Sequence, residues 1–275
     1  MTRRVMTWPD LHVPEHDPLA LACAYKVARH ILPDVLCWTG DMMECAPWSR
    51  HPRKTMPDDK CQLFRKMELD PTSSLIKLLL DQCTDELVYC EGNHEHRVEL
   101  WCANNEVGRD VFDALSPRAW FSGMNGVTWI PYQAEPLISH YEITPDLWLV
   151  HGWATGVTSE AKHLDACTNF SIIHGHTHIY GEASKVVPVV PHAGSAVEKR
   201  LFSMSPGCLR TLAPAWLGSK PQNWSHGLNI TYISEKTGHW TSVNYPIFNG
   251  RCIVEGTEIA ANSSDVDRMQ GVLGL

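Results

Sequence analysis

The sequence predicts an α/β fold, and two observations carry this prediction. Short apolar runs typical of buried strands alternate along the chain with longer segments whose apolar residues recur at helical spacing. Polar residues of the kind that bind metal ions follow directly after several of the strand-like runs. Open α/β sheets bind ligands outside the carboxyl ends of their strands. The order of the residues therefore predicts a functional site at one edge of the sheet.

The first third of the chain predicts a β-α-β-α-β unit. Strands are expected at residues 5–8, 35–38 and 86–90. Helices are expected at residues 18–32, where a proline suits the first turn, and at residues 73–83, where a serine is placed to cap the helix. Strands that are joined by helical crossovers run parallel, so their carboxyl ends meet at the same edge of the sheet.

The rest of the chain continues the pattern, with helices expected over residues 95–115 and 159–169 and strands over residues 127–130, 147–150, 171–173, 185–190, 228–233 and 240–248. No linker or repeat separates these segments. Residues 1–260 are therefore expected to form one domain, with a basic insertion at about residues 45–70. The polar residues near 262 predict a loose C-terminal tail over residues 261–275.

Composition narrows the classes of protein to consider. The 275 residues carry a formal net charge of −8, so no overall basic surface indicates nucleic acid or an anionic membrane as a partner. No run of about 18 apolar residues predicts a membrane span, and the N-terminus lacks a secretory signal. The ten cysteines include no C-x-x-C pair, which favours buried reduced thiols. We expect a cytoplasmic protein with no membrane partner, and nothing indicates a protein partner.

Seven residues of metal-ligand type fall into five short motifs, which read Asp10-Leu11-His12, Gly40-Asp41, Gly92-Asn93-His94-Glu95, His151-Gly152 and Gly175-His176-Thr177-His178. Taken singly, Asp10, Asp41 and Asn93 also suit turns, and a lone histidine such as His151 is common at a strand end. Together they supply oxygen and nitrogen ligands, which suit Mn²⁺, Fe or Zn²⁺ better than a thiolate site would. Five such motifs in succession indicate a metal centre.

These blocks resemble the calcineurin-like metallophosphoesterase family, whose pattern is D-x-H, G-D, G-N-H-[DE], H and G-H-x-H. The match runs from Asp10 to His178, and the GNHE and GHTH blocks are its most specific parts. The resemblance implies two stacked mixed β-sheets flanked by helices, an αββα sandwich. It also implies two divalent metal ions, with Mn²⁺ favoured and Fe or Zn²⁺ as the other candidates.

The resemblance assigns a role to each motif residue. Asp41 would bridge the two ions; Asp10, His12 and His178 would complete the first site, and Asn93, His151 and His176 the second. His94 is our candidate general acid for the leaving oxygen. Glu44, three residues after Asp41, would orient His94, although Glu stands here where Asp is more usual. His174 shares the strand parity of His176 and is expected to be a structural or a supporting residue.

The arginines of the protein Ser/Thr phosphatase branch, after GD and before GNHE, are missing from this chain, which argues against a phosphoprotein phosphatase. A basic segment near Trp48 instead contains Arg50, Arg53 and Lys54. These side chains are candidates for holding a phosphodiester backbone. The alternative is a solvated loop whose charge is balanced by nearby acidic residues.

Two enzyme hypotheses and one rival follow. The first is a phosphodiesterase that acts on nucleic acid or nucleotides. The second is a phosphomonoesterase that acts on a small metabolite. The rival is a non-catalytic binding scaffold with the same fold, and the presence of His94 argues against it.

Overall fold

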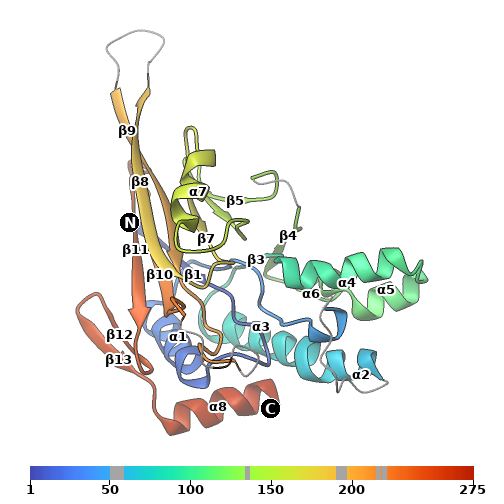
Figure 1. Ribbon diagram of the computed structural model, residues 1–275. Coiled ribbons are helices and arrows are strands. Elements are labelled where there is room, and N and C mark those ends of the chain that lie inside the picture. The colour runs from blue at the N-terminus through green and yellow to red at the C-terminus, as the bar shows by residue number, and fades with distance from the viewer. Residues whose placement is uncertain (50–58, 134–136, 190–196, 215–217, 219–221) are drawn as a thin grey trace.

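The computed structural model describes the chain except for residues 50–58, 134–136, 190–196, 215–217 and 219–221. Two mixed β-sheets stack against each other, and helices cover their outer faces (Figure 1). This confirms the α/β class and the two-sheet sandwich. A separate β-hairpin pairs β12 (Arg251–Val254) with β13 (Thr257–Ala260).

The first sheet has six strands in the order β11-β10-β1-β2-β3-β4. Neighbouring strands from β1 to β4 run parallel, and β10 and β11 extend the sheet in antiparallel fashion. The bounds are β1 (Thr2–Trp8), β2 (Val35–Trp38), β3 (Leu87–Cys90), β4 (Val127–Ile130), β10 (His226–Ser234) and β11 (Trp240–Ile247). The strands predicted in this sheet all exist.

The second sheet has five strands in the order β5-β6-β7-β9-β8. Its parallel centre is β6-β7-β9, with β5 and β8 antiparallel at the two edges. The bounds are β5 (Tyr141–Thr144), β6 (Leu147–Val150), β7 (Ser171–His174), β8 (Tyr180–Val189) and β9 (Val197–Pro206). Figure 1 shows the long β8–β9 hairpin projecting from the body of the molecule.

The central strands β2 and β3 of the first sheet are buried on both faces, which explains their continuous apolar runs. In β2, Val35 and Cys37 face the second sheet, where they meet Leu149 and Ile173. Alternate residues of the same strand, such as Trp38, face the helices on the other side. Those helices are α1 (Pro18–Ile31) and α3 (Asp70–Gln82). Helix α8 (Ser263–Leu273) packs against α1 and α3, and α7 (Ser159–Ala166) covers the second sheet.

Two helix starts show where cap prediction succeeds and fails. Helix α1 begins at Pro18, and the Asp17 carboxylate accepts a hydrogen bond of 2.8 Å from the Ala20 N–H. Helix α3 begins at Asp70 with a proline in its first turn, so the predicted serine cap is wrong. The Ser74 hydroxyl instead lies inside the helix and donates to the Asp70 carbonyl at 3.0 Å. The preceding segment already turns as a helix, so no capping residue is required there.

The remaining helical segments are η1 (Ala46–Trp48), α2 (Lys60–Phe64), the π-helical turn η2 (Arg65–Leu69), α4 (Asn93–Asn104), α5 (Arg109–Leu115) and α6 (Pro117–Phe121). The helix expected over residues 95–115 is thus divided into α4 and α5. Residues 50–58 of the predicted basic insertion, including Arg50, Arg53 and Lys54, lie outside the described residues.

The predicted loose tail is wrong, because residues 263–273 form α8. The Asn262 side chain accepts from the Asp265 N–H, and the Asp265 carboxylate accepts from the Asn262 N–H, which makes a capping box. Met269 and Leu273, four residues apart, are buried, and α8 contacts α1 and α3. The polar residues that indicated a tail are the start signal of a packed helix.

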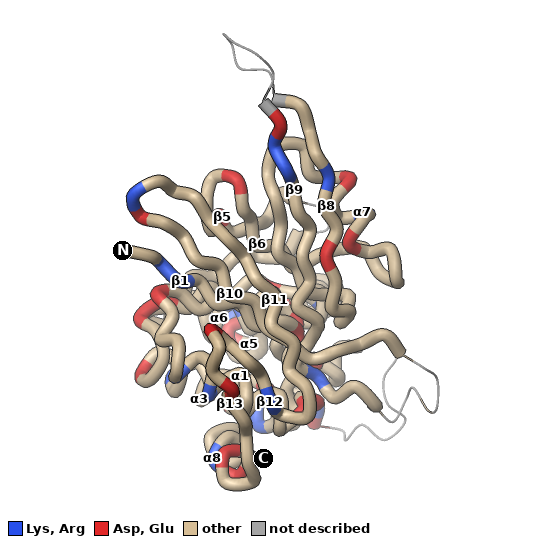
Figure 2. Tube along the Cα trace, turned by 90° about the vertical axis from the view of Figure 1, so that its left-hand side faces the viewer, with Lys and Arg blue, Asp and Glu red and all other residues tan. Residues whose placement is uncertain are grey.

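All ten cysteines are free thiols, and only Cys61 among them is exposed. In the part of the chain that the structure covers, no helix has the length and apolar character of a membrane span. Basic and acidic residues are interspersed along the elements in the view of Figure 2, without a face of one sign.

Candidate metal centre

The predicted ligands gather where the carboxyl ends of strands from both sheets meet. Asp10 and His12 follow β1, Asp41 follows β2, Asn93 and His94 open α4 after β3, His151 follows β6, and His176 and His178 follow β7. The parallel strands of each sheet therefore deliver residues up to 168 positions apart to one place, as the pattern of motifs predicted.

The loops that carry these residues turn sharply after the strands end. Five residues have left-handed backbone angles, with φ of 29° at Asp10, 55° at His12, 51° at Asp41, 69° at His176 and 59° at His178. Such conformations cost on the order of 1 kcal/mol or more for a non-glycine residue, and they cluster at functional sites. These five backbone conformations reduce the stability of the fold, and they position the candidate ligand side chains.

The motif glycines allow the loops to approach one another. A Cβ on Gly175 would clash with the Asp10 carboxylate and the Thr39 hydroxyl. At Gly40, where φ is +104°, a Cβ would come within 2.7 Å of His151 Nδ1. These two positions therefore require glycine, because the ligand side chains occupy the space that a Cβ would need.

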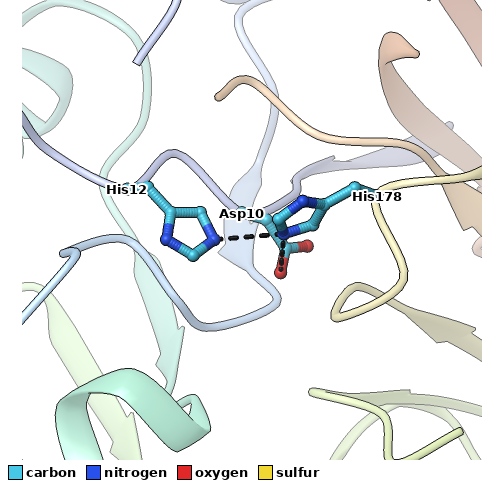
Figure 3. Close-up of side chains that lie close together, drawn as sticks. All are labelled: Asp10, His12 and His178. Atoms are coloured by element: carbon cyan, nitrogen blue, oxygen red, sulfur yellow. Dashed lines mark hydrogen bonds and ion pairs between the residues drawn. The ribbon is translucent and has the colours of Figure 1, made fainter. Parts of the chain in front are cut away.

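The first group of candidate ligands is Asp10, His12 and His178 (Figure 3). The Nε2 atoms of His12 and His178 lie 3.1 Å apart, and His178 Nε2 lies 3.6 Å from Asp10 Oδ1. All three side chains are buried. The His176 N–H donates to Asp10 Oδ1 at 2.8 Å and so fixes that carboxylate in place.

The second group is Asp41, His151, His176 and Asn93. His151 Nε2 lies 3.0 Å from Asn93 Oδ1, 3.2 Å from His176 Nδ1 and 3.5 Å from Asp41 Oδ2. Asp41 Oδ2 also lies 4.0 Å from His12 Nε2 in the first group. The carboxylate of Asp41 thus stands between the two groups, where the predicted bridging ligand belongs. Its other oxygen accepts the His94 N–H at the start of α4, at 2.8 Å.

Hydrogen bonding shows that the donor set fits metal ions. His151 Nδ1 lies 2.9 Å from the Thr39 carbonyl oxygen, which can only accept, so Nδ1 carries the proton and Nε2 keeps a lone pair. That lone pair faces Asp41 Oδ2, which is also an acceptor. His12 follows the same rule, with Nδ1 donating to Glu44 Oε2 at 2.8 Å and Nε2 facing His178. Two acceptors that face each other in this way are suited to hold a cation between them.

Burial sets the charge states of these groups. It lowers the pKa of His176 to about 3 and that of His178 to about 4, and it also lowers the pKa values of His12 and His151. These imidazoles are therefore neutral, as metal ligands must be. Burial raises the pKa values of Asp10 and Asp41, because the protein alone does not compensate two buried carboxylates. Bound cations would reverse that effect.

Glu95 is a supporting residue that we did not identify from the sequence, although it is the last residue of the GNHE block. Its fully buried carboxylate accepts five hydrogen bonds, from the N–H groups of Asp41, Met42, Met43 and Gly92 and from the Tyr89 hydroxyl. The bonds join the loop after β2 to the loop after β3. Glu95 thereby fixes the spacing between the bridging carboxylate and the start of α4.

Glu44 acts differently from the prediction. Its carboxylate bonds to His12 and forms an ion pair of 2.9 Å with Arg210, whereas it lies 3.7 Å from His94 Nδ1. His94 is instead held by the backbone carbonyl of Glu44, at 2.7 Å from Nδ1. The residue does position His94, through its main chain, while its side chain orients a ligand of the first group.

Arg210 also lies at the site, and none of the five sequence motifs includes it. It is buried, pairs with Glu15 and Glu44, and approaches His12 Nδ1 at 3.2 Å. A cavity of about 600 Å³ opens beside both groups, and it is lined by His12, Asp41, Glu44, Ala46, Ser49, Asn93, His94, Arg97, His176, His178, Arg210 and Trp224.

His174, expected to be structural or supporting, is buried behind the second group. It stacks on His163 with ring centroids 3.8 Å apart. The described residues also contain a separate Glu91, His96 and Glu99 group with metal-ligand spacing. His96 Nδ1 lies 3.8 Å from Glu91 and 4.0 Å from Glu99, and these carboxylates raise the pKa of His96. We therefore interpret Glu91, His96 and Glu99 as a cluster of ion pairs.

Comparison with known proteins gives distant relatives. No family model matches the sequence. The Gene 54 protein of Mycobacterium phage L5 is 25% identical over 268 residues, covering 93% of this chain and 98% of its own length. The Gene 54 protein of Mycobacterium phage D29 is 24% identical over 273 residues with the same coverage. Among solved structures, YfcE, a phosphoesterase from E. coli, is 16% identical with a TM-score of 0.35, covering 87% of this chain and 98% of that one. These identities do not assign the chain to a family.

Proposed function

We propose that this protein is a dinuclear metal-dependent phosphoesterase. The observation that carries the proposal is the convergence of two groups of neutral imidazoles and buried carboxylates on either side of Asp41. Two ions held there, for which we propose Mn²⁺, would neutralise a phosphoryl group and make a water molecule nucleophilic near neutral pH. Asp10, His12 and His178 would hold one ion, Asn93, His151 and His176 the other, and Asp41 both.

His94 is the proposed proton donor to the leaving oxygen. Its Nδ1–H is committed to the Glu44 carbonyl, so Nε2 is the nitrogen that exchanges a proton with substrate. His94 lines the cavity, and its Nε2 lies 3.8 Å from Asp41 Oδ2. A protonated Nε2 at this place can donate to an ester oxygen as the bond to phosphorus breaks.

For the substrate we propose a phosphodiester of a nucleotide or nucleic acid. A cavity of about 600 Å³ has room for more than a phosphate group, and Trp224 and two arginines line it. Arg50, Arg53 and Lys54 remain proposed contacts to a longer substrate. The second candidate, a phosphomonoesterase on a small metabolite, uses the same ligands. A non-catalytic scaffold is disfavoured, because such a protein would not need His94 to line the cavity with Nε2 left for proton transfer.

The proposal is tested by hydrolysis of bis-p-nitrophenyl phosphate and p-nitrophenyl phosphate with and without Mn²⁺. We expect metal-dependent turnover, with the diester favoured. The Asp41→Asn variant should lose activity and at least one ion, because it removes the carboxylate placed between the two groups. Elemental analysis that finds two ions still bound to this variant would reject the assignment of Asp41.

The nucleic-acid substrate is tested separately. Replacing Arg50, Arg53 and Lys54 with alanine should weaken nucleic-acid binding or cleavage and reduce its salt dependence by about one unit of slope per lost phosphate contact. A small nitrophenyl diester should be hydrolysed as before, because it has no further phosphate groups for these side chains to contact. Normal cleavage of nucleic acid by the triple variant would move the small-metabolite substrate to first place.

A further inference from the structure

Arg97 is a cation at the candidate site that none of the motifs includes. It lies on α4, one turn after Asn93 and His94, and its half-buried side chain lines the cavity. Its charge acts on the site: it opposes the burial that raises the pKa of Asp41, and it adds to the burial that lowers the pKa of His94. The position raises the question of which anion Arg97 serves.

The contact between Arg97 and His94 is not a satisfied hydrogen bond. Arg97 Nη1 lies 3.1 Å from His94 Nδ1, but that nitrogen also lies 2.7 Å from the Glu44 carbonyl oxygen. The carbonyl can only accept, so Nδ1 carries a proton and points it at Glu44. The guanidinium of Arg97 also carries only hydrogen-bond donors, so it cannot accept that proton. Its N–H groups therefore remain available to an acceptor in the cavity.

Arg210 provides a comparison within the same cavity. Its guanidinium is buried and paired with the carboxylates of Glu15 and Glu44. Among the described residues, Arg97 has no carboxylate within ion-pair distance. The protein thus neutralises the charge of Arg210, whereas no carboxylate of the described ranges neutralises the charge of Arg97.

We propose that Arg97 binds the unesterified oxygens of the substrate phosphoryl group. The inference rests on the proposed function and adds to it a phosphate-binding residue from outside the metal ligands. A guanidinium presents parallel N–H donors that match two phosphate oxygens, which a lysine cannot reproduce. Placed beside His94, Arg97 would hold the phosphoryl group with its leaving oxygen near the proposed proton donor.

The test is binding of inorganic phosphate to the full-length, Mn²⁺-loaded protein by titration calorimetry. Arg97→Gln should raise the Kd for phosphate about 10- to 100-fold, the range for a charge-assisted hydrogen bond. Arg97→Lys should recover part of the affinity. Arg109→Gln, which removes an exposed arginine paired with Asp113 on α5, is the matched control and should bind phosphate as the wild type does.

Each outcome decides between the proposals. If Arg97→Gln keeps two bound ions and binds phosphate more weakly than the wild type, the result supports the role of Arg97. Unchanged phosphate affinity overturns it, and so does a loss of metal in this variant, because Arg97 would then hold the centre together. If the wild type binds phosphate through Arg97 but hydrolyses no ester, the proposed function fails and the binding role stands. If the wild type hydrolyses esters and Arg97→Gln matches it, only the binding role fails.

Discussion

At the scale of single residues, each of three site histidines commits one ring nitrogen to the protein and presents the other to the site. His12 is held by the Glu44 carboxylate, His94 by the Glu44 carbonyl and His151 by the Thr39 carbonyl. The motifs predicted which residues would gather. Of the holding partners, only Glu44 was named, and its side chain was assigned to His94 and not to His12. The partners lie 32, 50 and 112 positions away and use main-chain atoms in two of the three cases.

Replacing His94 should separate proton donation from metal binding. His94→Ala should keep both ions, because His94 belongs to neither half of the proposed ligand set. On esters with poor leaving groups the rate should fall by about 10²- to 10⁴-fold. Nitrophenyl esters should lose less, since nitrophenolate leaves without a proton. Steady-state rates on an alkyl and a nitrophenyl diester measure the difference, and equal losses on both would assign His94 to phosphate positioning instead.

A buried histidine behind the site should make stability depend on pH. His163 Nε2 accepts from the N–H groups of Trp153 and Ala154, and burial lowers the pKa of His163 to about 4. As pH falls below about 6.5, the unfolded chain binds a proton that the folded chain refuses until about pH 4. The stability that this histidine contributes is therefore complete above pH 6.5 and is lost as pH falls toward 4.

The measurement is urea unfolding of the wild type and His163→Gln at pH 7.5 and pH 5. The glutamine variant lacks this titration, so the stability difference between the two proteins should shrink by about 2 kcal/mol at the lower pH. Histidines that lie away from His163 titrate equally in both proteins and cancel. An equal difference at the two pH values would show that the protonation of His163 is not linked to folding.

At the scale of elements, the strand ends were predictable and the loops after them were not. Apolar runs followed by Asp, Asn or His located β1, β2, β3, β6 and β7, because a strand buried on both faces leaves a clear sequence pattern. The caps of α3 and α8 were misjudged, since serine and asparagine occur in tails, turns and capping boxes alike. Local composition alone does not distinguish a tail, a turn and a capping box. The tertiary contacts of the segment do.

Glu95 couples two of these loops, and its loss should affect both. Glu95→Gln replaces a carboxylate oxygen with an amide that faces N–H donors. We expect a loss of about 2–3 kcal/mol in stability and 10- to 100-fold weaker metal binding. Glu99→Gln, one turn later on α4 and in contact with the Ser116 hydroxyl at 3.4 Å, is the control and should change metal affinity little. Unaltered metal affinity in Glu95→Gln would mean that the loops hold their spacing without it.

At the scale of the whole molecule, the two sheets contribute different ligands to one centre. The first sheet delivers Asp10, His12, Asp41 and Asn93, and the second delivers His151, His176 and His178. The proposed ions would therefore join the halves of the sandwich at the end of the core that packs between them. The sequence indicated the α/β class by itself, while the stacking of two sheets came only through the resemblance, because periodicity does not report which sheet a strand joins.

Removing the ions should consequently destabilise the entire sandwich. Without the ions, the charges of the buried carboxylates of Asp10 and Asp41 lack compensation. An ion that binds only the folded state stabilises that state by about 2.7 kcal/mol when the ion concentration is about 100 times its Kd. For a chain of this size we expect chelation to lower Tm by about 5–10 °C. Calorimetry before EDTA, after it and after Mn²⁺ is restored measures the effect, with Asp41→Asn as the variant that should respond little. An unchanged Tm, with occupancy verified by elemental analysis, would show that the ions do not join the two sheets energetically.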